Sequence, residues 1–207
     1  MILTLVYDKF GYYYKPRIWF DKLAEYSAGL IILSGCLNGP VSYELYKGNT
    51  AKAIEYVKKF RGVFGDDYYI ELQMPYLYDT ENGFDDYKVF WALNKIADKF
   101  GIKKVLTNDA HYLKRGDFET QKLMMAVDQG LTVDDPNLFH VNSSEQFLKN
   151  RQELYHTFIT KKYSEHATRA DFEEMCDNTI LIAEKCSNFE PDLSSKIPTS
   201  EDHPTML

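Results

Sequence analysis

The chain has 207 residues and a formal net charge of −7, with 24 basic and 31 acidic side chains. This length predicts one domain or slightly more, and 44% hydrophobic residues exclude a mainly disordered chain. The acidic balance argues against broad, sequence-independent binding to nucleic-acid phosphates. Three separated cysteines exclude a disulfide scaffold, and the first residues lack the pattern of a signal peptide, so we expect a cytoplasmic protein.

Strand-like and helix-like segments alternate through the first two thirds of the sequence. The strands are short and rich in β-branched or aromatic residues, and the helices carry an apolar stripe that ends at a glycine. This alternation predicts an α/β fold with parallel strands and outer helices. Strands are expected at 30–34, 68–72 and 104–107, and helices at 50–64, 85–100 and about 117–127.

The pattern changes after Gly130, where a loop is followed by two helices. Ser143 or Ser144 is expected to open the first of them, which contains Phe147. The second is expected at 169–185, with both Cys176 and Cys186 on its buried stripe. The sequence from Asn188 onward is rich in Pro and Ser, which is typical of a linker.

Tyrosine and phenylalanine are unusually frequent, at 16 and 13 residues. A tyrosine suits a protein interior only where its hydroxyl finds a partner. We therefore expect many half-buried faces.

Two segments that follow predicted strands carry metal-binding residue types. Asp109 and His111 come directly after the third strand, and strand geometry would point both side chains the same way. Cys36 follows the first strand. Such residues can bind zinc or manganese. The alternatives are that Asp109 caps a turn while His111 lies on the surface, and that Cys36 is a small buried apolar residue.

Other polar residues are less specific. Glu71 and Gln73 alternate with apolar residues on the second strand, where we favour a structural pair with a nearby Lys or Arg. The remaining histidines are expected in loops or on polar helix faces rather than as ligands: His140, His156, His166 and His203.

Five segments together resemble the PHP (polymerase and histidinol phosphatase) domain of the alpha subunit of bacterial and phage DNA polymerase III. They occur in the order of that family and at about its spacing, and the resemblance covers nearly the whole chain. The segments are 13–17, 29–37, 69–73, 107–113 and 177–186.

The resemblance implies a distorted βα barrel whose metals lie at the carboxyl ends of the strands. It implies a metal-dependent 3′–5′ exonuclease or phosphoesterase activity in members with all of the metal ligands. Carried over by position, Cys36 matches the cysteine ligand of the family, and Asp109 and His111 match its final Asp-x-His pair.

The His-x-His strand of the family is absent, and about three strands are present where the barrel has seven. We therefore expect a partial barrel at 1–130, a helical part at 131–187 and, at 188–207, a linker toward a missing polymerase palm. Three strands do not close a barrel, so the first strand is expected to have an unpaired edge. The sequence is thus interpreted as a truncated part of the domain.

Three functions follow from this interpretation. The chain acts as a non-catalytic scaffold that holds the other half of the domain or other polymerase subunits. Alternatively, its Zn or Mn ligands complete a nuclease site when that half is supplied, or it is a phosphoesterase by itself. Without palm carboxylates it is not expected to polymerise DNA, and contact with DNA is expected to be indirect. A homo-oligomer through the exposed sheet edge is also expected.

Overall fold

A computed structural model of the chain describes residues 12–13, 15–16, 18–75, 78–79, 84–140, 143–191 and 193. Most of the expected tail, including His203, lies outside these residues, as do parts of segment 13–17. None of the helices in the described part combines the length and apolar character that crossing a membrane requires.

The centre of the fold is a three-stranded parallel sheet in the order β3–β4–β7. Its strands are β3 (Ile32–Leu33), β4 (Tyr68–Gln73) and β7 (Lys104–Thr107). The α/β class and the parallel direction agree with the prediction, although β3 is shorter than expected. Two small antiparallel pairs were not expected: β1 (Tyr12–Tyr13) with β2 (Lys15–Pro16), and β5 (Tyr78–Asp79) with β6 (Phe84–Asp85).

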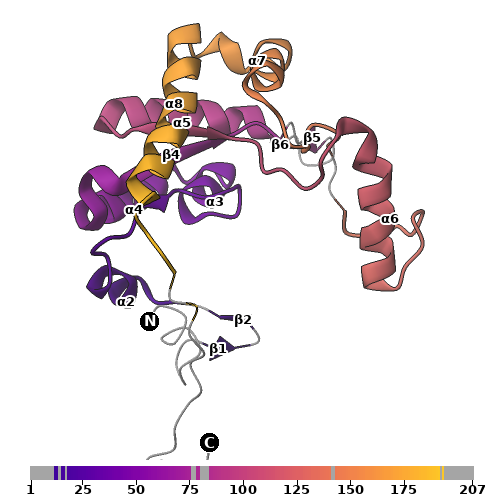
Figure 1. Cartoon of the computed structure of the whole chain (residues 1–207), viewed down its shortest axis with the longest axis horizontal. Coiled ribbons are helices and arrows are strands. Elements are labelled where there is room, and N and C mark those ends of the chain that lie inside the picture. Colours follow the sequence, from indigo (N-terminus) through magenta and orange to yellow (C-terminus); the bar gives the residue numbers. More distant parts are fainter. Residues whose placement is uncertain are drawn as a thin grey trace, which may run out of the picture.

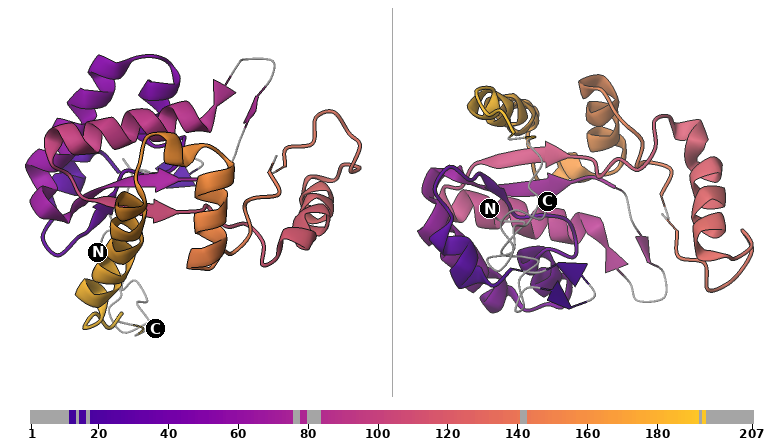
Figure 2. Two further views of the ribbon diagram at one scale, coloured as in Figure 1. Left: turned by 90° about the horizontal axis from the view of Figure 1, so that it is seen from above. Right: turned by 60° about the horizontal axis from the view of Figure 1, so that its bottom comes forward.

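The helices are arranged around this sheet (Figure 1). The helices are α2 (Phe20–Glu25), α3 (Pro40–Tyr46), α4 (Thr50–Phe64), α5 (Asp86–Phe100), α6 (Phe118–Gln129), α7 (Arg151–Thr160) and α8 (Arg169–Cys186). Short 3-10 turns separate several elements: η1 (Gly65–Asp67), η2 (Arg115–Asp117) and η3 (Tyr163–Glu165). Helices α3, α4 and α5 pack together on one side of the sheet, whereas α8 lies along β7 and α6 projects from the body (Figure 2).

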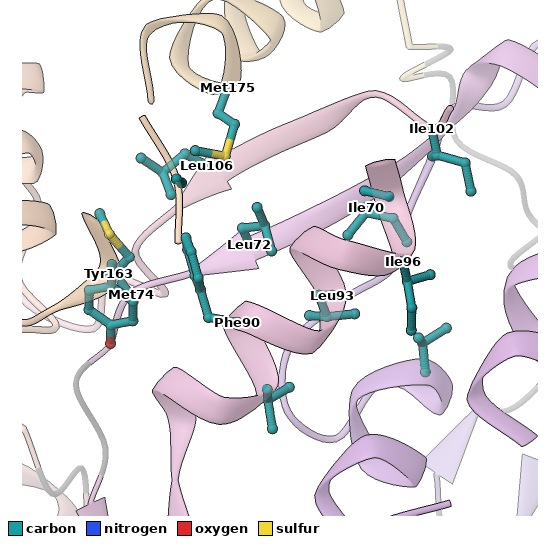
Figure 3. Close-up of a cluster of buried hydrophobic side chains, with 14 of the residues drawn as sticks. Ile70, Leu72, Met74, Phe90, Leu93, Ile96, Ile102, Leu106, Tyr163 and Met175 are labelled. Carbon is teal, nitrogen blue, oxygen red and sulfur yellow. The ribbon is translucent and has the colours of Figure 1, made fainter. Parts of the chain in front are cut away.

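The main core joins the sheet to α5 and α8 (Figure 3). Because side chains alternate along a strand, Ile70 and Leu72 share one face of β4, and the register places Leu106 of β7 beside Leu72. Phe90 of α5 and Met175 of α8 belong to the same buried cluster. This packing holds the strands in position, and it therefore positions the residues that follow their carboxyl ends.

Two expectations for the last third are wrong. Residues 143–150 do not form a helix. α7 begins at Arg151, because the Asn150 side chain accepts a hydrogen bond from the Glu153 N–H and the Glu153 carboxylate accepts one from the Asn150 N–H. Cys176 is buried, as expected, but Cys186 is exposed. The apolar stripe of α8 extends beyond the part of the helix that packs on the sheet.

The tyrosines are distributed between the core and the surface. Tyr68 and Tyr163 are fully buried, whereas Tyr43 and Tyr46 are about half-buried, at 41% and 44% exposed. The Tyr163 hydroxyl donates to an Asp86 carboxylate oxygen at 2.8 Å. Burial raises the pKa of Tyr68, whose hydroxyl has no hydrogen-bond partner among the described residues. The expectation of half-buried faces is thus met by some tyrosines only.

Candidate functional site

The carboxyl ends of the three parallel strands open onto one cleft of about 440 Å³. Cys36 follows β3, Gln73 ends β4, and Asp109 and His111 follow β7; all four residues line the cleft. This is the edge where α/β folds place their sites. The three residues selected from the sequence are therefore brought to the walls of one cavity.

A tight turn presents Cys36 to the cleft. Gly35 has a φ of 81°, and the Gly39 N–H donates to the Cys36 carbonyl at 2.8 Å. A Cβ on Gly39 would lie 2.5 Å from the Ser34 carbonyl oxygen, so only glycine fits there. Ser34 ties the turn to β4, because its hydroxyl accepts a hydrogen bond from the Glu71 N–H at 2.9 Å.

Asp109 and His111 form a close pair on the β7 side. The His111 Nε2 lies 3.5 Å from the Asp109 Oδ2, and both side chains are partly exposed. Asp109 has a φ of 49°, in the left-handed region. Strand geometry does not continue beyond Thr107, contrary to our expectation, and the left-handed conformation of Asp109 brings the two side chains together instead.

Gln146 holds this pair in place, although the sequence pattern did not indicate it as a site residue. Its Nε2 donates to the Asp109 Oδ2 at 3.2 Å, and its main-chain carbonyl accepts from the His111 N–H at 2.8 Å. Gln146 is only 3% exposed. It is 37 residues from Asp109 in the sequence, so no local pattern could have indicated it.

A buried ion cluster fixes the segment that carries Gln146. Arg115 donates to both carboxylate oxygens of Glu145, at 2.6 and 3.1 Å, and the Lys149 Nζ lies 3.4 Å from the Glu145 Oε2. Asn108 donates to the main-chain carbonyls of Glu145 and Phe147. The end of β7 is thereby joined to the segment beside it.

The cluster shifts the ionisation of its members. Burial opposes the charge of Glu145, but the hydrogen bond from Arg115 and the charges of Arg115 and Lys149 outweigh it and lower the pKa of Glu145. Burial lowers the pKa of Lys149, an effect that the charge of Glu145 opposes. The charged form of Glu145 and the charged form of Lys149 therefore stabilise each other.

The polar residues of β4 do not form the basic pair that we favoured. The Glu71 Oε1 accepts hydrogen bonds from the Gln73 Nε2 at 3.0 Å and from the Thr107 hydroxyl at 2.7 Å. No ion pair of Glu71 occurs in the described part of the chain. These bonds join β4 to β7 at the edge of the cleft.

The histidines differ in their positions. His140 lines the same cleft as His111, although its sequence gave no reason to select it. His166 packs against Trp91 and Tyr87. His156 lines a separate cleft beside α7.

The residues in the cleft lining whose types can bind a metal are Cys36, Asp109, His111 and His140. Within the described ranges, no three His, Cys, Asp or Glu side chains come close enough to share an ion. Asp109 and His111 offer two neighbouring donors, and the Asp109 carboxylate already accepts from Gln146. These residues by themselves do not fit a multi-metal centre.

Comparisons with known proteins find similarity to one domain family and to one group of polymerase subunits. The profile of the PHP domain family matches residues 2–75. The DNA polymerase III subunit alpha of Treponema pallidum is 34% identical over 179 residues, which cover 86% of this chain. The match to the PHP profile thus covers the first part of the chain, and the match to the polymerase subunit covers most of it.

Two further relatives are also DNA polymerase III alpha subunits. The DNA polymerase III subunit alpha of Deinococcus radiodurans is 34% identical over 86% of the chain, and that of Aquifex aeolicus is 34% identical over 89%. The chain spans only 12–15% of the length of these three relatives. The similarity therefore reaches beyond the residues matched by the family profile, but into a small part of each relative.

Proposed function

We propose that this PHP chain serves in DNA replication as part of a DNA polymerase III alpha subunit, as a scaffold that is not catalytic alone. The observation that carries the proposal is 34% identity to such subunits over 86% of the chain. In this proposal, residues 1–130 contribute part of the barrel, residues 131–187 cover it, and residues 188–207 lead toward the polymerase.

The sheet edge supports a scaffold role. The Ser34 N–H donates to the Tyr69 carbonyl, so by alternation the main-chain groups of Leu33 point away from β4. In the described part of the chain no strand pairs with that edge. Such an edge can accept a strand from another polypeptide, and the proposed partners are the other half of the domain or further polymerase subunits.

A second candidate function is favoured by the close Asp109–His111 pair. When a partner supplies further donors, this pair and Cys36 would take part in a metal site of a 3′–5′ exonuclease, with Zn or Mn as the metal. A metal there would activate water and bind phosphate oxygens. The chain's own contribution is to hold Asp109 through Gln146 and Cys36 through its glycine turn.

An assay of nucleotide release from DNA distinguishes the scaffold function from the exonuclease function. The full chain is incubated with manganese and single-stranded DNA labelled at its 3′ end, alone and with a polypeptide that contains the His-x-His half of a PHP domain. We expect no release by the chain alone. Release that appears only with the added half, and is lost in Asp109→Asn but retained in Asp66→Asn, supports the second function. Release by the chain alone that is lost in Asp109→Asn contradicts the scaffold proposal.

A further inference from the structure

Beside α7 lies a second cleft, of about 380 Å³, whose lining shares no residue with the cleft that holds Asp109. Two of the residues that line this α7 cleft are leucines open to solvent: Leu113 is 71% exposed and Leu148 is 63% exposed. Phe147, which is buried, lines the same cleft. Single exposed leucines are common on protein surfaces, but two that line one hollow beside an aromatic ring form an apolar patch for another molecule to cover.

Main-chain hydrogen bonds hold the two leucines in position. Tyr112 and Phe147 form a parallel bridge, and the Leu148 N–H donates to the Tyr112 carbonyl at 2.9 Å. Leu113 follows Tyr112, whose hydroxyl donates to the Ser143 carbonyl at 2.6 Å. The apolar walls are therefore formed before a ligand binds, which lowers the entropic cost of binding.

Positive charge lies beside these apolar walls. Lys114 and Arg115 line the α7 cleft together with one carboxylate, Glu153, in a chain whose net charge is −7. Glu153 is already engaged, because its Oε2 accepts a hydrogen bond from the Asn150 N–H at the start of α7. Within the described ranges, no carboxylate forms an ion pair with Lys114. The cleft therefore suits a ligand that carries negative charge.

Arg115 is held in place and still has donors for a ligand. It donates to the two carboxylate oxygens of Glu145 at 2.6 and 3.1 Å, and its Cζ lies 5.2 Å from the centroid of the Phe147 ring. A guanidinium has five N–H donors, and the Arg115 side chain is 53% exposed at the cleft. A carboxylate in the cleft would thus meet a cation that is already ordered, so that little side-chain entropy is lost on binding.

We propose that the α7 cleft binds a short peptide segment of another protein chain, in which a large apolar side chain stands next to a Glu or Asp. The apolar side chain would pack between Leu113 and Leu148, beside Phe147. The neighbouring carboxylate would accept hydrogen bonds from Arg115 and Lys114. The volume of the cleft is at the lower end of the range for small-ligand sites, roughly 300–1,000 Å³, and so suits a few side chains rather than a whole domain.

The lining favours a peptide over single-stranded nucleic acid. Binding of unpaired bases relies on exposed aromatic rings, whereas Phe147 is buried and the exposed walls are aliphatic. The inference goes beyond the proposed function, because the α7 cleft contains no residue of β3 and neither Asp109 nor His111.

The test is an NMR titration of the full chain with the blocked peptide acetyl-Ser-Glu-Leu-Leu-Glu-Ser-amide. We expect weak, saturable binding that shifts the methyl signals of Leu113 and Leu148 and that weakens as salt is added. Replacing both Glu of the peptide by Gln should weaken binding roughly tenfold, because charge-assisted hydrogen bonds are lost. Replacing both Leu of the peptide by Ala should abolish binding, since the apolar contact is removed.

Two variants of the chain leave the buried Glu145 pairs intact, so they are expected to fold. Leu148→Ser should weaken binding of the peptide roughly fivefold or more. Lys114→Gln should weaken binding of the Glu peptide but not of its Gln form. Their matched controls are Leu193→Ser and Lys58→Gln, because both residues are exposed and lie outside the α7 cleft. The controls should bind like the wild type.

The proposal is overturned by the absence of saturable binding, by equal binding of the Glu, Gln and Ala peptides, or by equal effects of the variants and their controls. Loss of self-association in Leu148→Ser without peptide binding would assign the patch to a second copy of the chain and would also overturn it. The titration needs no metal, DNA or other half of the domain. Its failure is therefore distinct from failure of the proposed replication role.

Discussion

The charge of Glu145 supports the candidate site, because its ion pairs hold the segment that carries Gln146. Its side chain is 4% exposed, that of Lys149 is fully buried, and Arg115 completes the cluster. The cluster holds Gln146, which in turn holds Asp109. The site therefore has its support in residues that never reach the cleft themselves.

Glu145→Gln should lower the free energy of unfolding by about 3 kcal/mol, because it leaves the buried charge of Lys149 without its partner. Urea unfolding measures this change. Glu173→Gln is the control: Glu173 pairs with Arg151 at 3.0 Å but is 37% exposed, so its loss should cost less than about 1 kcal/mol. Equal effects of the two variants would contradict the importance of the buried cluster.

The same variants have a defined pH dependence. The pKa of Glu145 in the folded state lies below its ordinary value of 4.5, so the stability from its ionised form is fully present above that pH. It is lost as the pH falls through the lower, folded-state pKa. The difference in stability between wild type and Glu145→Gln should accordingly be constant near neutral pH and shrink under acid conditions.

At the scale of elements, the turn between β3 and α3 decides where Cys36 lies. Gly39→Ala should destabilise the protein by about 1–3 kcal/mol, since the new Cβ meets main-chain atoms that cannot move aside easily. Gly62→Ala is the matched control in α4, where a Cβ has open space around it. It should stabilise the protein by about 0.5–1 kcal/mol through helix propensity. Thermal unfolding of both variants checks these opposite signs, and a neutral Gly39→Ala would contradict the tight turn.

At the scale of the whole molecule, the uncovered edge of β3 should promote association. We expect size-exclusion chromatography with light scattering to detect species larger than the 24.1 kDa monomer. Leu33→Pro removes the outward N–H and should reduce association, whereas Leu33→Val keeps that N–H and should not. A single monomeric species at all concentrations would contradict the role of this edge.

The sequence by itself determined the α/β class, the order of the strands along the chain and the ends of several helices. These features depend on local physics. Apolar periodicity located α4 and α5, and a glycine marked the end of each of them. The resemblance carried by separate segments also indicated the PHP domain family, whose profile independently matches residues 2–75.

Only the tertiary structure decided how Cys36, Asp109 and His111 are held. Gln146 lies 37 residues from Asp109 and Glu145 lies 30 residues from Arg115, and a hydrogen bond between such distant segments leaves no periodic pattern in the sequence. The left-handed conformation of Asp109 likewise departs from the strand geometry that its neighbours predicted. Local preferences thus set the elements of this protein, while the cleft arises from contacts that form only when β7 and residues 143–150 lie side by side.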